Sequence, residues 1–161
     1  GALLGVDFRL AAPESLQPDL KVEARALEIA ESSGGSILVT DDPLEAVLHA
    51  DFIYTDVWVS MGETMDVWND RIELLRSFQV NQTLLDATKN PNVKFMHCLP
   101  ALHDTETDIG KQIAENYGLQ SGVEVTDQVF QSDASIVFDQ AENRLHTIEA
   151  LLVLVSSERF Q

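Results

Sequence analysis

The chain has 161 residues, 45% of them hydrophobic, and its 10 lysines and arginines against 27 aspartates and glutamates give a formal net charge of −17. This length suits a single domain, and the acidic balance excludes nucleic acid or an anionic membrane as the partner, because both require a basic face. No apolar run reaches the ~20 residues of a membrane span, no secretory leader is visible, and the single cysteine suits a reducing compartment, so we expect a soluble cytoplasmic protein.

Strands and helices are expected to alternate along the chain. Residues 1–5 read as the last turn of a helix that ends at Gly5, so we expect a domain truncated at its N-terminus. Apolar spacing predicts strands at residues 6–12, 37–40, 52–55 and 93–97, and helices at residues 18–33, 43–49, 64–78, 81–87, 108–117 and about 143–156, with residues 123–130 irregular. Such alternation predicts one α/β domain over residues 1–161, with a doubly wound, Rossmann-like parallel sheet covered by helices on both faces.

Two polar runs follow predicted strands. DVWVSMGE begins at Asp56, directly after one strand, and HCLPA begins at His97, where another ends. In a parallel α/β sheet, ligands lie beyond the carboxyl ends of the strands. These two runs therefore mark the candidate site.

The first run offers groups suited to an amino acid. A carboxylate at Asp56 suits an ammonium group, although a turn or helix cap is an equally good interpretation of that residue alone. Ser60 and Met61 add a hydroxyl and a flexible apolar contact, but such residues also occur in ordinary loops. Taken alone, the run does not decide between binding and structure.

The second run contains the only thiol. Cys98 is either an inert core residue or a working group facing a ligand. In an extended chain His97 points to the opposite face, so adjacency does not make the two residues a nucleophile and its base. This argues against a thiol hydrolase.

Arg144 is expected at the start of the last helix. A guanidinium there can reach an anion, and an ion pair with Glu142 or Asp139 is at least as plausible an interpretation. The remaining histidines, which show no metal-ligand spacing, are His49, His103 and His146. We expect neither a metal nor a cofactor.

The two runs, together with VKFMHCLPA, residues 122–127 and SIVFDQAENRLHTIEA, resemble the second domain of ornithine carbamoyltransferases over nearly the whole chain. The resemblance implies that Asp56, Ser60 and Met61 bind ornithine. It also implies roles at the reaction centre. Cys98 and Leu99 would approach the ornithine amine and the carbamoyl group, while His97 would contact the carbamoyl carbonyl and Arg144 would hold carbamoyl phosphate.

The implied reaction moves a carbamoyl group from carbamoyl phosphate to the side-chain amine of ornithine, giving citrulline and phosphate in arginine metabolism. The resemblance further implies a homotrimer or a multiple of it, in which each active site borrows residues from a neighbour's first domain. That domain's Ser-Thr-Arg-Thr-Arg loop is absent from this sequence, so we expect a fragment that is inactive alone. The alternatives are a non-catalytic module binding a small anion or nucleotide, and a related carbamoyltransferase with another amine acceptor.

Overall fold

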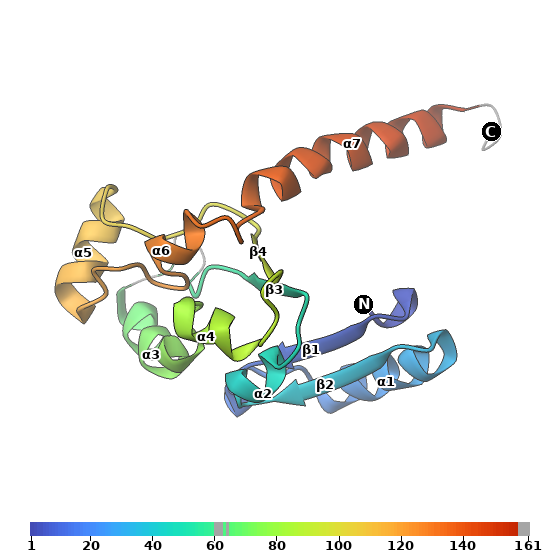
Figure 1. Ribbon diagram of the computed structural model, residues 1–161, viewed down its shortest axis with the longest axis horizontal. Coiled ribbons are helices and arrows are strands. Elements are labelled where there is room, and N and C mark those ends of the chain that lie inside the picture. Colours follow the sequence, from blue (N-terminus) through green and yellow to red (C-terminus); the bar gives the residue numbers. More distant parts are fainter. Residues whose placement is uncertain (60–62, 64, 158–161) are drawn as a thin grey trace.

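The computed structural model describes residues 1–59, 63 and 65–157, within which helices and parallel strands alternate (Figure 1). The strands are β1 (Asp7–Ala11), β2 (Ser36–Thr40), β3 (Phe52–Thr55) and β4 (Lys94–His97). The α-helices are α1 (Leu20–Ser33), α2 (Pro43–Val47), α3 (Met65–Leu75), α4 (Gln82–Ala87), α5 (Asp108–Tyr117), α6 (Asp127–Phe130) and α7 (Val137–Ser156). Short 3₁₀ helices form at η1 (Ala2–Leu4), η2 (Glu14–Leu16) and η3 (Arg76–Phe78).

Local sequence signals explain where the first helices begin and end. The Asp19 carboxylate accepts a hydrogen bond from the backbone N–H of Lys21 and so caps α1, which ends at Gly34 in the left-handed conformation with φ 80°. Asp42 caps α2 through the backbone N–H groups of Leu44 and Glu45. These boundaries therefore lie close to the predicted ones.

The prediction of an α/β fold with parallel strands is confirmed. Among the described strands, β1 pairs with β2 and β3 pairs with β4, so the strands are divided between two two-stranded sheets. The alternation of strands and helices did not reveal this division, because apolar periodicity identifies a strand without identifying its partner. Arg9 of β1 donates from Nη1 to the carbonyl of Leu48, which follows α2 and begins the segment that leads into β3.

Two hydrophobic clusters form the core. The first lies around β3 and β4 and is built on Phe95, which is fully buried in the middle of β4. The second lies between α3 and α5 and includes Ile72 and Ile113. Both clusters adjoin the carboxyl ends of β3 and β4, so they support the loops that leave those ends.

The last two helices differ from the predictions. Residues 127–130, expected to be irregular, form α6, and α7 begins at Val137 instead of near residue 143. The early start follows from the preceding segment, in which the N–H of Ile136 donates to the carbonyl of Phe95 and the chain turns directly into the helix. Residues 139–142 lack the apolar stripe that guided the prediction, yet alanine, glutamate and glutamine are good helix formers.

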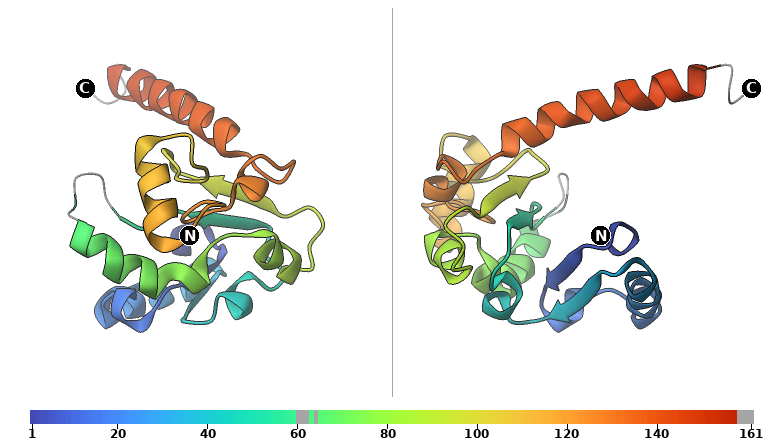
Figure 2. Two further views of the ribbon diagram at one scale, coloured as in Figure 1. Left: turned by 90° about the vertical axis from the view of Figure 1, so that its left-hand side faces the viewer. Right: turned by 45° about the vertical axis from the view of Figure 1, so that its right-hand side comes forward.

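Helix α7 extends away from the rest of the molecule, as Figures 1 and 2 show. Val137 at its start is buried, but residues 141–156 are exposed. The exposed apolar side chains of α7 are Phe138, Leu145, Ile148, Leu151, Leu152, Val153, Leu154 and Val155. None of the helices in the described ranges has the length and hydropathy needed to cross a membrane.

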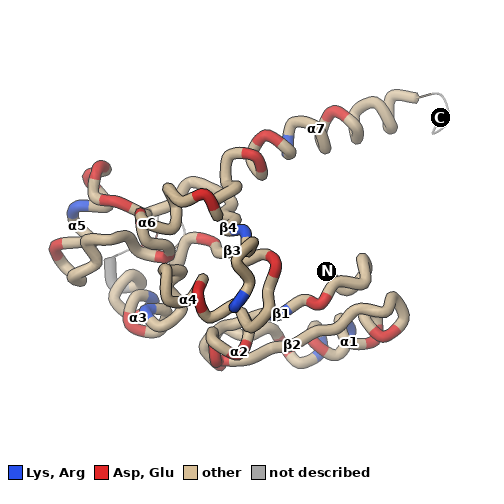
Figure 3. Tube along the Cα trace, viewed as in Figure 1, with Lys and Arg blue, Asp and Glu red and all other residues tan. Residues whose placement is uncertain are grey.

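Acidic positions are spread over the helices and loops, with few basic positions between them (Figure 3). The charge is therefore a general property of the surface. Any site for an anion in this chain has to be built from a few local donors.

Candidate active site at the carboxyl ends of β3 and β4

Asp56 and Cys98 meet because β3 and β4 run parallel. Thr55 is paired with His97 in the register of the two strands, which places the next residue of each strand side by side. The Cys98 Sγ–H donates to Asp56 Oδ1 at 2.9 Å, and the same oxygen accepts from the N–H of Val57 at 2.7 Å. Two predicted site residues, separated by 42 positions in sequence, are thus in direct contact.

The neighbourhood keeps the thiol protonated. Partial burial raises the pKa of Cys98, and the hydrogen bond to Asp56 and the charge of that carboxylate raise it further, since ionisation would place two negative charges together. Burial also raises the pKa of Tyr54, and the nearby Cys98 and Asp56 act in the same direction. A neutral thiol is a poor nucleophile, so this arrangement does not favour covalent catalysis by Cys98.

His97 lies in the protein interior. Its side chain is fully buried, with Nε2 3.2 Å from Glu124 Oε1, and its Nδ1 accepts a hydrogen bond from the N–H of Leu99 at 2.9 Å. The Nε2 contact is within ion-pair distance, although its angle falls short of hydrogen-bond geometry. The imidazole therefore faces the core and not the open edge at which we expected it to contact a substrate carbonyl.

Glu124 is a buried residue that the sequence analysis did not select. Its side chain is fully buried, and Oε1 accepts from the N–H of Leu102 at 2.6 Å. The sequence did contain a signal for this residue. Glu124 stands between Val123 and Val125, two apolar residues that are buried, and a carboxylate buried beside them requires a polar partner.

Arg144 lies within α7 and not at its start. Within the described ranges its guanidinium forms no ion pair, so the pairs with Glu142 or Asp139 that the sequence allowed are not made. One helical turn before it, the Gln140 side chain accepts a hydrogen bond from the N–H of His97 at 3.0 Å. Arg144 lies one helical turn beyond Gln140 and is exposed, and among the described residues no hydrogen bond or ion pair joins its side chain to Asp56 or Cys98.

Leu99 follows Cys98 in the loop after β4. Leu99 is half-buried and has a φ of 52°, a backbone conformation that is uncommon for such a residue. Ser60 and Met61 lie outside the described residues, so their predicted contact with an amino-acid ligand stays a prediction.

Another polar cluster lies beside α6. His103 Nδ1 is 2.8 Å from Asp127 Oδ1, and with Asp104 these residues place three possible metal-ligand atoms within 4.8 Å of one another. The imidazole also stacks on Phe130, with ring centroids 3.7 Å apart. Hydrogen bonding and stacking account for this arrangement as packing of the loop against α6.

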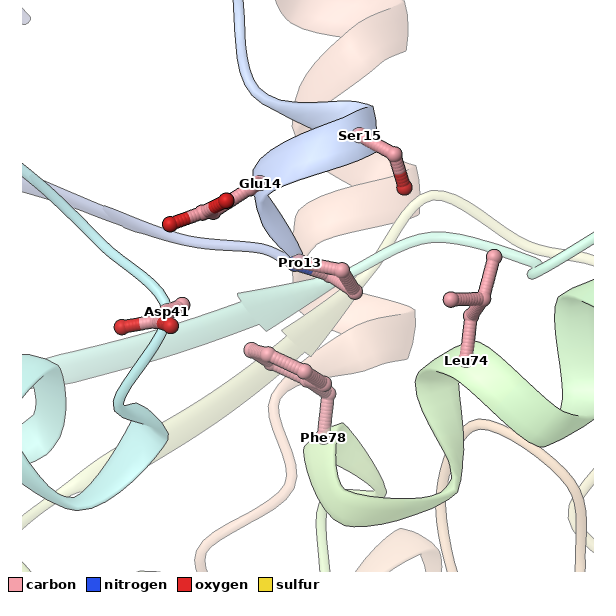
Figure 4. Close-up of a pocket in the computed structure, with 6 residues that line it drawn as sticks. All are labelled: Pro13, Glu14, Ser15, Asp41, Leu74 and Phe78. Carbon is pink, nitrogen blue, oxygen red and sulfur yellow. The ribbon is translucent and has the colours of Figure 1, made fainter.

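A hollow of about 470 Å³ lies apart from these residues, beyond the carboxyl ends of β1 and β2. Figure 4 shows Pro13, Leu74 and Phe78 facing one another, with Glu14 and Asp41 to one side. Among the described residues, those that line the hollow include no basic side chain and no predicted site residue. We therefore assign the candidate site to the ends of β3 and β4.

Comparisons with known proteins point to one family. The family model described as aspartate/ornithine carbamoyltransferase, Asp/Orn binding domain, matches residues 1–155. A catabolic ornithine carbamoyltransferase of Rhizobium meliloti (strain 1021) is 56% identical over 153 residues, which cover 95% of this chain and 46% of that protein. The chain thus spans about half the length of this curated relative.

Solved structures that resemble the chain include ornithine carbamoyltransferases. An ornithine carbamoyltransferase from Pyrococcus furiosus is 43% identical with a TM-score of 0.76, covering 95% of this chain and 42% of the other. An anabolic ornithine carbamoyltransferase from Campylobacter jejuni subsp. jejuni NCTC 11168 is 28% identical with a TM-score of 0.77, covering 96% of this chain and 44% of the other.

The contact between Asp56 and Cys98 predicts an effect on thiol reactivity. In Asp56→Asn the negative charge that opposes ionisation of Cys98 is removed, so the thiol pKa falls and alkylation at neutral pH becomes faster. The measurement is the rate of modification of Cys98 by iodoacetamide across a pH series, followed by mass spectrometry. The control is Asp51→Asn, the same change at the residue that directly precedes β3, and it should leave the alkylation profile unaltered. An unchanged profile in Asp56→Asn would contradict the geometry.

Proposed function

The chain belongs to the aspartate/ornithine carbamoyltransferase family, as its Asp/Orn-binding domain, and we propose that it forms the ornithine side of an ornithine carbamoyltransferase. The observation that carries the proposal is the contact between Asp56 and Cys98 at the ends of adjacent parallel strands. In the complete enzyme, carbamoyl phosphate and ornithine would give citrulline and phosphate.

In this proposal Asp56 holds the α-ammonium group of ornithine. Its carboxylate is exposed at the edge of the sheet, where an incoming cation can reach it without displacing the core. Ser60 and Met61, four and five positions further along the same sequence run, are assigned to the ornithine carboxylate and its aliphatic stem. The resemblance of DVWVSMGE to the family's ornithine-binding loop supports these assignments.

The chemistry requires positioning more than covalent catalysis. The neutral side-chain amine of ornithine attacks the carbamoyl carbon, a C–N bond forms, the C–O bond to phosphate breaks, and the amine loses a proton. Cys98 and Leu99 line this centre and orient the amine, and no thioester forms because the amine is itself the nucleophile. The raised pKa of Cys98 supports an orienting role, since a neutral thiol can donate a hydrogen bond. His97 acts from the interior, as a support for the loop that contains Cys98.

Arg144 binds the carbamoyl phosphate side of the site. Its freedom from ion pairs within the described ranges, and its position one turn beyond Gln140, support this role. A planar guanidinium can form two parallel hydrogen bonds to an oxyanion or carbonyl group.

Another domain of the same protein, the one called the first domain in the family, supplies the other half of the site. The apolar side chains exposed along α7 support such a partner, because a contiguous apolar helix is costly to leave in water. We further propose assembly as a homotrimer or a multiple of it, as the resemblance implies, in the cytoplasm, which the single cysteine supports.

The proposal is tested by assaying citrulline formation from ornithine and carbamoyl phosphate. The two-domain protein should turn over both substrates, whereas the 161-residue chain alone should not, since its sequence lacks the basic loop that would neutralise the phosphate. Absence of turnover in the two-domain protein would reject the proposed function. Turnover by the chain alone would reject the need for a second domain.

Asp56→Asn in the two-domain protein should weaken ornithine binding roughly tenfold to a hundredfold, as expected for about 1.5–3 kcal/mol from one hydrogen bond to a charged group. Carbamoyl phosphate binding should change little. Calorimetric titration of each substrate measures both effects. An unchanged ornithine affinity would remove Asp56 from the ornithine site.

Arg144→Lys should lower turnover about tenfold if roughly 1.4 kcal/mol of transition-state stabilisation depends on the second hydrogen bond of the guanidinium. Steady-state kinetics and thermal melting of the two-domain protein are the measurements. Arg25→Lys is the matched control, because Arg25 makes only an exposed pair with Glu28 on α1. Normal kinetics with a lowered melting temperature would instead identify Arg144 as a structural residue.

A further inference from the structure

His97 and Glu124 are fully buried polar residues that the proposed chemistry does not use directly. Burial of an imidazole and a carboxylate is costly unless each finds partners, so their presence here requires a reason. Both lie directly beneath the loop of residues 98–102, which connects the end of β4 to the segment before α5. Their contacts with this loop suggest what they do.

A single carboxylate oxygen contacts both ends of the loop. Glu124 Oε1 accepts from the N–H of Leu102 at 2.6 Å and lies 3.2 Å from Nε2 of His97. On its other side, the His97 ring accepts at Nδ1 from the N–H of Leu99 at 2.9 Å. The carboxylate and the imidazole together therefore fix the chain at residues 97, 99 and 102.

The hydrogen bond to Leu99 defines the state of the imidazole. A ring nitrogen that accepts a hydrogen bond carries no proton, so Nδ1 is unprotonated, and Nε2 is the ring atom that faces Glu124 Oε1 at 3.2 Å. The carboxylate thereby favours the tautomer whose Nδ1 can hold the N–H of Leu99. Loss of the carboxylate would remove this preference and leave the N–H of Leu102 without its partner.

Glu124 is itself held firmly by the backbone around it. Its carbonyl accepts from the N–H of Val80, and the N–H of Val123 donates to the carbonyl of Leu102 at 2.7 Å. Val80 and Val125 also form an isolated parallel bridge. The loop is thus held against a buried segment that is itself fixed by backbone hydrogen bonds.

We propose that Glu124, acting through His97, is a positioning residue that holds the 98–102 loop so that Cys98 stays against Asp56. The expected effect on turnover rests on the proposed function, whereas the expected effect on the position of Cys98 does not. Because a displacement of about 1 Å at a reaction centre can lower rates by about a hundredfold, loosening this loop should affect catalysis.

The test compares Glu124→Leu, Glu124→Gln and Thr88→Val in the two-domain protein. Leucine removes both contacts of Oε1, whereas glutamine keeps an oxygen that can accept from Leu102. Thr88 is equally buried and donates to the carbonyl of Leu85, away from the loop, so its variant controls for the loss of a buried polar group. Four quantities are measured for each protein: the melting temperature, the pH profile of Cys98 alkylation, and kcat and KM for ornithine.

In Glu124→Leu we expect the Cys98 profile to move to lower pH, because the thiol leaves Asp56, whose hydrogen bond and negative charge raise the thiol pKa, and becomes better solvated. Turnover should fall on the order of tenfold to a hundredfold, and Glu124→Gln should restore part of both properties. Thr88→Val should lower only the melting temperature. A Glu124→Leu protein with a lowered melting temperature, an unchanged Cys98 profile and unchanged kinetics would overturn the proposal.

A second pair of variants covers the case in which Glu124→Leu does not fold. His97→Asn retains an acceptor for the N–H of Leu99 but loses the contact with Glu124, and His97→Gln does the reverse. The proposal expects both to shift the Cys98 profile, and it is overturned if neither does. If the wild-type protein does not convert ornithine, the proposed function fails, while the alkylation profiles still decide the positioning role.

Discussion

The parallel pairing of β3 with β4, in which Thr55 lies opposite His97, determines where each polar group of the candidate site lies. Asp56 and Cys98 become neighbours because each is the first residue after its strand. His97, one position earlier, points to the other side and enters the core, as alternation along a strand requires. The segment of residues 134–136 forms a parallel bridge with Phe95 of β4, and α7 begins directly after this segment. A shift of one residue in this register would separate Asp56 from Cys98 and bring His97 to the surface.

Asp56 has two electrostatic consequences that suit the proposed transfer reaction. A carboxylate at the exposed edge attracts an ammonium group, and the same carboxylate opposes ionisation of the adjacent thiol. A site designed for a cysteine nucleophile would require the opposite, namely a neighbouring cation that lowers the thiol pKa. The arrangement is consistent with a reaction in which the substrate supplies the nucleophile and the protein supplies orientation.

The exposed face of α7 gives the proposed docking of another domain a physical basis. The described strands form two separate pairs, and the longest helix exposes apolar side chains along its whole outer length. Arg144 lies on this helix, one turn from the residue that contacts the end of β4, so a partner covering α7 would also approach the site. This relation links the proposed docking of a second domain with the proposed binding of carbamoyl phosphate.

The sequence by itself determined the elements that depend on local chemistry. Apolar periodicity, the caps at Asp19 and Asp42 and the glycine at Gly34 defined the early strands and helices, and the runs after β3 and β4 identified Asp56 and Cys98. The tertiary structure alone decided the properties that depend on packing between distant segments. Glu124 and His97 are separated by 27 positions, so no local pattern reveals that a buried carboxylate fixes the imidazole and the loop above it. The start of α7 likewise depends on the pairing of the preceding segment with β4. The division of the strands into two pairs depends on which strand edges meet. Both follow from hydrogen bonds made between segments that are distant in the sequence.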